Sequence, residues 1–277
     1  MRTIFAILVG CLASLSPVQA QLVLPGAVPA QGAAPVAGKG TGTLPKRQKP
    51  AAVKIPGEES IAGRELAQNG ARGRIGFVKA GDALNVTLLQ LAGSQISRPD
   101  DACQIDVVAG AAMTARPMGH PAGPLRYGVD LEACPFSFDV LDGAVLVGPL
   151  PNACVFQAAD CKGDPAGLWG PRGASLGPDR IKEIERARAS AEAAMREAFR
   201  NLLERASGNP AVKAASRDQA GFTSLRSEIC RDYLREDVHG FCALVLTQAR
   251  ALALKADLGQ AAPAEGEAGP KRKRRRK

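Results

Sequence analysis

The chain has little of what a metal centre or a cofactor site requires. Its 277 residues include two histidines, His120 and His239, and no pair of cysteines in a C-x2-C arrangement. Structural zinc sites use Cys and His ligands at short, regular spacings. The glycine-rich stretch 38–43 lacks the spacing of a phosphate-binding loop. We therefore expect neither a metal nor a cofactor.

Paired catalytic side chains are also missing. Carboxylates such as Asp160, Asp164, Glu228 and Asp232 stand without the partner that general acid–base catalysis needs. There is no nucleophile–base pattern either. The sequence therefore predicts a protein that is not an enzyme and has no catalytic residues, and a cell-wall hydrolase is the least favoured reading.

Long apolar runs are absent, and the most apolar segment lies in residues 1–20. Arg2 is followed by an apolar stretch over 4–15 and by the small-residue sequence Val18-Gln19-Ala20. This arrangement is typical of a cleaved signal peptide, and the stretch is well short of the ~20 residues of a membrane-spanning helix. The alternative is lipoprotein processing at Cys11. We expect a periplasmic or secreted protein.

Removal of the signal peptide would leave six of the seven cysteines, an even number that favours disulfides in an exported chain. Inward faces and proximity favour Cys103–Cys134 and Cys154–Cys161. A swapped pairing within these four is the alternative. The complete set is Cys103, Cys134, Cys154, Cys161, Cys230 and Cys242.

The formal net charge of +9 comes from the ends of the chain, and the remainder is mildly acidic. A basic nucleic-acid-binding domain is therefore not expected. Residues 21–57 are rich in Ala, Pro and Gly and read as a disordered linker, and 259–277 read as a disordered tail. The tail offers seven consecutive cations for anionic lipid or polysaccharide: Lys271, Arg272, Lys273, Arg274, Arg275, Arg276 and Lys277.

Residues 58–172 show the pattern of short strands. The segment 136–147 is the clearest, because Asp142-Gly143 supplies the positive φ angles of a tight hairpin. Phe136, Phe138 and Val140 would share its inward face. About seven such strands predict a small antiparallel β-sandwich or barrel, and with the helices that follow they make an α+β protein.

Residues 175–258 have helical periodicity. We expect one helix from Pro178 to about 205, a second from Pro210 to about Tyr233, and a third over 241–257. Trp169 stands at the switch from strands to helices. It is either an exposed aromatic contact or a plug that packs the two domains together.

Two lines of side chains stand out in the second and third helices. Gln219, Phe222, Arg226 and Cys230 fall on one helix face, and Arg226 is expected to reach a carbonyl cluster or a carboxylate, because an unpaired buried charge is costly. The second line follows Cys242 and consists of Thr247, Arg250 and Leu254.

This combination resembles the LprI-type lysozyme-inhibitor-like domain of exported bacterial proteins. That family has the pattern Q-x2-W-x3-R-x3-C, then C-x4-T-x2-R-x3-L, and here Phe222 replaces the tryptophan. The match covers about residues 191–254. The resemblance implies a Cys230–Cys242 disulfide that clips the second and third helices, with Arg226 and Arg250 organising the domain.

The resulting hypothesis is an exported, non-catalytic binding protein whose partner is another protein, of which a lysozyme-like enzyme is one possibility. The alternative is a structural envelope protein whose basic ends grip anionic surface polymers. Binding of a specific nucleic acid is not expected.

Overall fold

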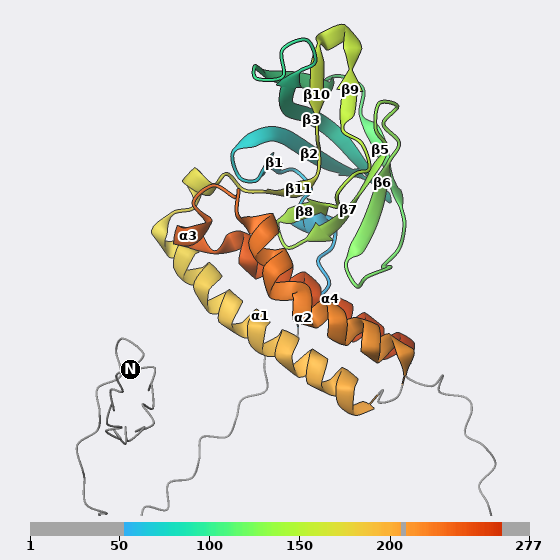
Figure 1. Cartoon of the computed structure of the whole chain (residues 1–277), viewed down its shortest axis with the longest axis vertical. Helices are drawn as coiled ribbons and strands as arrows, with labels where there is room; N and C mark the ends of the chain where they lie inside the picture. The colour runs from blue at the N-terminus through green and yellow to red at the C-terminus, as the bar shows by residue number, and fades with distance from the viewer. Residues whose placement is uncertain (1–52, 206–208, 262–277) are drawn as a thin grey trace, which may run out of the picture. The chain divides into compact units, whose positions relative to one another are not determined.

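The computed structural model describes residues 53–205 and 209–261. Eleven strands come first, and three long helices with one short helical turn follow (Figure 1). The strands are β1 Glu65–Gln68, β2 Arg72–Ala80, β3 Ala83–Gln95, β4 Ala102–Val108, β5 Met113–Pro117, β6 Leu125–Val129, β7 Phe136–Leu141, β8 Ala144–Val147, β9 Cys154–Phe156, β10 Cys161–Gly163 and β11 Gly167–Gly170. The helices are α1 Pro178–Arg205, α2 Pro210–Cys230, α3 Glu236–His239 and α4 Phe241–Ala261. The α+β class is confirmed.

Eight of the strands close into an antiparallel barrel. The ring runs β1-β2-β3-β5-β6-β7-β8-β11 and returns to β1. The predicted hairpin is present, because Leu141 pairs with Ala144 across Asp142-Gly143 and Gly143 has a φ of 72°. A closed barrel has no free edges in its ring, which makes it one of the two architectures that the strand pattern predicted.

The three remaining strands extend the barrel at one place. β3 is 13 residues long, and its far end pairs with β4 and with β10, while β9 pairs with β10. The Cys103–Cys161 disulfide joins β4 to β10 within this extension, and Cys134–Cys154 joins β9 to the segment between β6 and β7. The expected pairs Cys103–Cys134 and Cys154–Cys161 are therefore wrong, and the swapped alternative is correct.

The register of the strands explains the correction. In the β9–β10 pair, Cys154 lies opposite Gly163, so it does not face Cys161 although the two are close in sequence. β10 instead lies with β4 at the end of β3, which brings Cys161 to Cys103. Cys154 is then free to join Cys134, and both are buried in the barrel core.

Alternation along the strands separates two cores. The inward residues form one cluster inside the barrel, and it includes Phe136, Phe138 and Val140, as the sequence predicted. The outward residues of β7, β8 and β11 form a second cluster with the helices. Its members from the strands include Leu141, Ala144, Leu146 and Leu168, and those from the helices include Ile184, Phe241 and Val245.

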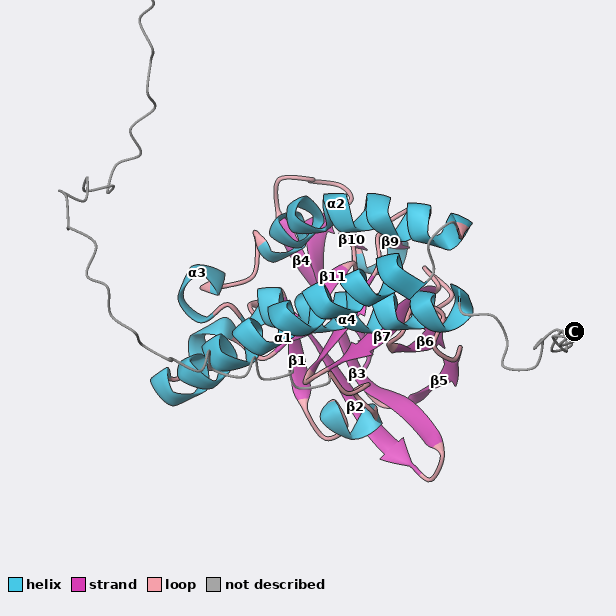
Figure 2. Ribbon diagram, turned by 90° about the horizontal axis from the view of Figure 1, so that it is seen from below, coloured by secondary structure: helices cyan, strands magenta, loops and turns pink. Residues whose placement is uncertain are grey.

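The helices cover this outer face of the barrel, and α4 packs against both α1 and α2 (Figures 1 and 2). The buried residues of α1 include Ile184, Ala191, Met195 and Leu202, which recur at the spacing of one helix face. α2 ends at Cys230, three residues before the predicted end. None of the helices in the described part of the chain is long and apolar enough to cross a bilayer.

Candidate functional site

The residues that resemble the family motif meet where α2 faces α4. The Arg226 guanidinium donates to the Thr247 hydroxyl at 2.8 Å and lies over the Phe222 ring, 5.4 Å from its centroid. A carboxylate oxygen of Glu192 on α1 is 3.8 Å away. The prediction that Arg226 reaches a carboxylate is thus confirmed, and its main partner on α4 is a hydroxyl.

The second arginine of the motif, Arg250, extends from α4 to α2, whereas Arg226 extends from α2 to α4. Arg250 donates to the side-chain oxygen of Gln219 at 3.0 Å and to the Ala215 carbonyl at 2.9 Å. Burial lowers the pKa of Arg250 below its ordinary value, and the carboxylates of Asp218 and Asp257 oppose that change. Both motif arginines therefore point into the helix pair.

The remaining motif positions are apolar contacts. Phe222 and Leu254 belong to a buried cluster with Met195 and Leu202 of α1, and Leu254 is fully buried. Both arginines are engaged in internal hydrogen bonds that link α2 to α4. The organising role that the resemblance implies for Arg226 and Arg250 stays a prediction.

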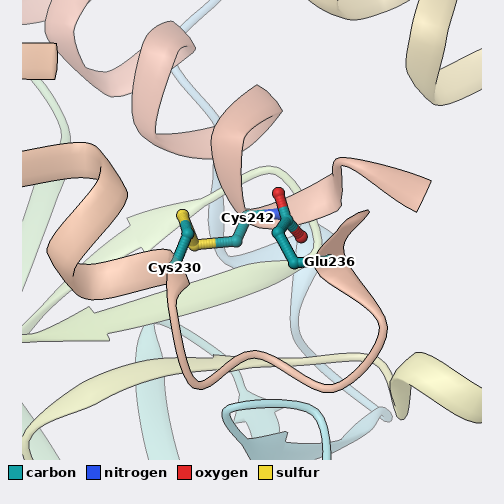
Figure 3. Close-up of side chains that lie close together, drawn as sticks. All are labelled: Cys230, Glu236 and Cys242. Carbon is teal, nitrogen blue, oxygen red and sulfur yellow. A yellow bond between two sulfur atoms is a disulfide. The ribbon is translucent and has the colours of Figure 1, made fainter. Parts of the chain in front are cut away.

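Ten residues, 231–240, connect α2 to α4, and the Cys230–Cys242 disulfide closes this loop (Figure 3). Glu236 lies beside the disulfide, and its carboxylate accepts hydrogen bonds from the amides of Cys242 at 3.0 Å and Ala243 at 2.8 Å. Burial raises the pKa of Glu236, and the two amide donors act in the opposite direction. Glu236 thus caps the first turn of α4.

The same three residues form the one group with metal-ligand types close together in the described chain, within 4.8 Å of one another. Because both sulfurs are joined in a disulfide, they are not thiolate ligands. The arrangement therefore serves as a covalent and hydrogen-bonded clip between the two helices.

His239 is buried. Its Nε2 donates to the Leu234 carbonyl at 2.8 Å, and its Nδ1 accepts from the Phe241 amide at 3.1 Å. These partners assign the ring proton to Nε2. The buried His239 ring thereby links Leu234 of the loop to Phe241, the first residue of α4.

The loop is also fixed to the barrel. The Tyr233 hydroxyl donates to the Pro171 carbonyl at 2.6 Å, and the Leu234 amide donates to the Asn69 carbonyl at 2.9 Å. Gly170 allows this approach, since a Cβ there would lie 2.7 Å from the Tyr233 hydroxyl. Burial raises the pKa of Tyr233, so the hydroxyl keeps its proton and remains a donor.

Two large apolar side chains nevertheless face solvent on this fixed loop. Leu234 is 40% exposed and Val238 is 47% exposed. Tyr233, which precedes Leu234, and His239, which follows Val238, are buried. We call Leu234 and Val238 the apolar loop surface. The sequence did not reveal it, because apolar residues between two cysteines give no sign of which ones the barrel covers.

Trp169 does not form an exposed contact. It is fully buried inside the barrel, where its indole N–H donates to the Pro165 carbonyl at 2.8 Å. Its neighbour Leu168 points outward and belongs to the cluster with the helices. Because side chains alternate along β11, the leucine takes the role of interdomain plug that was considered for the tryptophan.

The isolated carboxylates serve local structure. Asp160 accepts hydrogen bonds from the amide and hydroxyl of Ser97, which lower its pKa, and Asp164 accepts from the Ala166 amide at 2.8 Å. The predicted signal peptide, residues 1–20, and the tail 271–277 lie outside the described residues, as does most of the predicted linker 21–57.

Comparison with known proteins does not extend the resemblance. No family model, no curated protein and no solved structure matches this chain. The LprI-type relationship therefore stays a prediction that depends on the motif residues.

Proposed function

We propose that the protein is exported to the periplasm or cell envelope and binds another protein through the apolar loop surface, without catalysis. The observation that carries this proposal is the combination of exposure and rigidity in the loop. Leu234 and Val238 face solvent, yet the segment that holds them is closed by a disulfide and hydrogen-bonded to the barrel.

Rigidity matters because association loses less entropy when the contact residues are already ordered. Apolar anchors surrounded by polar residues are typical of the energetic centre of a protein interface. Here the exposed neighbours Arg235 and Asp237 supply a polar rim. Such a surface suits a folded partner that offers a matching apolar patch.

Two further observations support the location and the partner. Three disulfides favour an oxidising compartment, which agrees with the signal-like residues 1–20. The resemblance of the α2–α4 motif to the LprI type makes a lysozyme-like enzyme the first partner to test.

The test compares residues 21–277 with the double variant Leu234→Ser/Val238→Ser. Lysis of bacterial cells by a c-type lysozyme, and direct titration of the two proteins, measure the interaction. We expect the loop variant to bind about tenfold more weakly or worse, which corresponds to about 1.4 kcal/mol. The matched control is Leu203→Ser/Leu225→Ser, since these leucines are also exposed but lie on α1 and α2.

Circular dichroism melting of each variant checks that the fold is retained. Equal binding by the loop variant and the wild type would contradict the apolar loop surface. If the wild type neither binds nor inhibits, the lysozyme-like partner is wrong.

The basic tail favours a second candidate function, attachment to anionic surface polymers. Seven cations at 271–277 would each contribute about 1 kcal/mol near an anionic surface. Deletion of 271–277 should then release the protein from envelope fractions at low salt. Retention of the truncated protein would count against this role.

A further inference from the structure

A surface cleft lies at the barrel, away from the helix motif, between the β1–β2 turn and the end of β10. It is open to solvent and has a volume of about 520 Å³, within the range of roughly 300–1,000 Å³ that is typical of small-molecule sites. The side chains that can recognise a ligand there are Gln68, Asn69, Arg72, Ser94, Lys162 and Asp164.

The walls of the cleft are fixed before any ligand arrives. The Gln68 side-chain amide is buried and donates to the carbonyls of Asp164 at 2.7 Å and Ala166 at 2.8 Å. Lys162 pairs with Ser94 in the β10–β3 ladder. The three strands β1, β3 and β10 therefore present their polar groups from a rigid frame.

Two cations border the cleft without a carboxylate of their own. Within residues 53–205 and 209–261, neither Arg72 nor Lys162 forms an ion pair or a side-chain hydrogen bond. Other basic residues of the barrel, such as Arg74, Arg126 and Lys79, are paired with acids. Arg72 and Lys162 are therefore two unpaired cations beside a space that can take an anion, whereas Arg64, which is also unpaired among the described residues, does not line it.

The amide of Asn69 adds a buried polar group to the same cleft. Its side-chain oxygen is inaccessible to solvent and has no hydrogen-bond partner among the described residues. A buried polar atom without a partner costs roughly 1–3 kcal/mol. The oxygen lies against Gly167, so a ligand reaches the amide only if the Asn69 side chain rotates toward the cleft. After that rotation Asn69 can accept from a ligand hydroxyl or donate to a ligand oxygen, and the unpartnered oxygen gains a partner.

We infer that this cleft binds a small hydroxylated oxyanion, such as a monosaccharide that carries a carboxylate or a phosphate. Arg72 and Lys162 hold the anionic group, and Arg72 can do so with two parallel N–H donors. Asn69 bonds a hydroxyl group beside it. The volume of the cleft exceeds that of a bare inorganic anion, which favours an organic molecule. This inference does not depend on the proposed protein partner.

Asp164 is the one acid that lines the cleft, and its charge allows an anionic ligand to be distinguished from a cationic one. One of its oxygens already accepts from the Ala166 amide, but its charge still opposes an anion nearby. Neutralising it should therefore strengthen binding, whereas neutralising either cation should weaken it. A cleft for a cationic ligand would respond in the opposite direction.

The experiment is isothermal titration calorimetry of residues 21–277 with D-glucuronate, glucose 6-phosphate and uncharged glucose. We expect saturable 1:1 binding of at least one charged sugar, with glucose weaker by about tenfold or more. A preference for glucuronate identifies a sugar acid as the ligand class, and a preference for glucose 6-phosphate identifies a sugar phosphate.

Four variants assign the residues. Arg72→Gln and Lys162→Gln should each weaken binding about tenfold, and Asp164→Asn should tighten it. Asn69→Gly should weaken binding while keeping the fold, because Asn69 has a φ of 49° that glycine tolerates. The control is Lys182→Gln, which removes an exposed cation from α1.

Thermal melting of each variant separates loss of the site from loss of the fold. Absence of saturable binding by either charged sugar would overturn the inference. So would equal affinity of Arg72→Gln, Lys162→Gln and Lys182→Gln, or glucose binding as tightly as its charged analogues.

Discussion

The barrel encloses a core of apolar side chains, whereas α2 and α4 combine apolar packing with arginines that donate to neutral oxygens. Inside the barrel, the buried cluster runs from Ile61 to Trp169, and the indole of Trp169 makes one hydrogen bond to the nearby Pro165 carbonyl. Between the helices, Arg226 and Arg250 donate to Thr247, Gln219 and a main-chain carbonyl.

This difference determines how each region responds to change. Apolar packing is not directional, so the barrel depends on the volume and shape of its side chains. The hydrogen bonds of the helix pair are directional, so they depend on donors at particular positions. The barrel should therefore suffer most from lost volume, and the helices from a lost donor.

The largest expected effect is that of emptying the barrel. Trp169→Ala removes the largest fully buried side chain, and such changes cost roughly 3–5 kcal/mol. Trp169→Phe removes the N–H donor but keeps most of the apolar volume, so it should cost much less. Chemical denaturation followed by circular dichroism measures both. Equal losses in the two variants would mean that the hydrogen bond, rather than volume, dominates in the barrel.

A smaller effect is expected from the helix pair. Arg226→Ala removes a hydrogen bond from a charged donor, and such bonds contribute roughly 1.5–3 kcal/mol. The melting temperature should fall clearly. Arg217→Ala on the same helix, where the side chain is exposed, should leave it nearly unchanged. An unchanged melting temperature of Arg226→Ala would show that the helices are held by apolar packing alone, as the barrel is.

The sequence predicted the local elements of the barrel but not how its strands pair around the ring. Alternation at Phe136, Phe138 and Val140 and the Asp142-Gly143 turn were enough for the hairpin, because period and turn chemistry are local. The closure of the barrel could not be predicted from local patterns. It depends on the pairing of β1 with β11 and of β2 with β3, which no local pattern specifies.

At the candidate site, too, local features were predicted and long-range contacts were not. Helical spacing placed Gln219, Phe222 and Arg226 on one face, and the structure confirms that they meet α4. Proximity in sequence failed for Cys154 and Cys161, since the disulfides follow strand register. Burial of His239 and exposure of Leu234 also escaped prediction, because both depend on where the barrel lies against the loop.

The smallest effect concerns a polar contact of the barrel, formed by Glu58, Tyr127 and Lys79, whose dependence on pH distinguishes it from the contacts between the helices. Glu58 accepts a hydrogen bond from the Tyr127 hydroxyl and pairs with Lys79 at 2.6 Å. Lys79 and then Tyr127 lower the pKa of Glu58 below its ordinary 4.5. The stabilisation is therefore present above pH 4.5 and is lost as the pH falls through the lowered value.

Glu58→Gln should lower the free energy of unfolding by about 1 kcal/mol at pH 7, since solvent screens the ion pair between Glu58 and Lys79. As the pH falls through this lowered pKa, protonation of Glu58 should make the wild type and the variant converge. The arginine contacts of α2 and α4 use neutral acceptors at Thr247 and Gln219, so Arg226→Ala should keep most of its deficit there. Melting curves from pH 3 to 7 measure this, and parallel losses in both variants would mean that the helix pair depends on its carboxylate neighbour Glu192 instead.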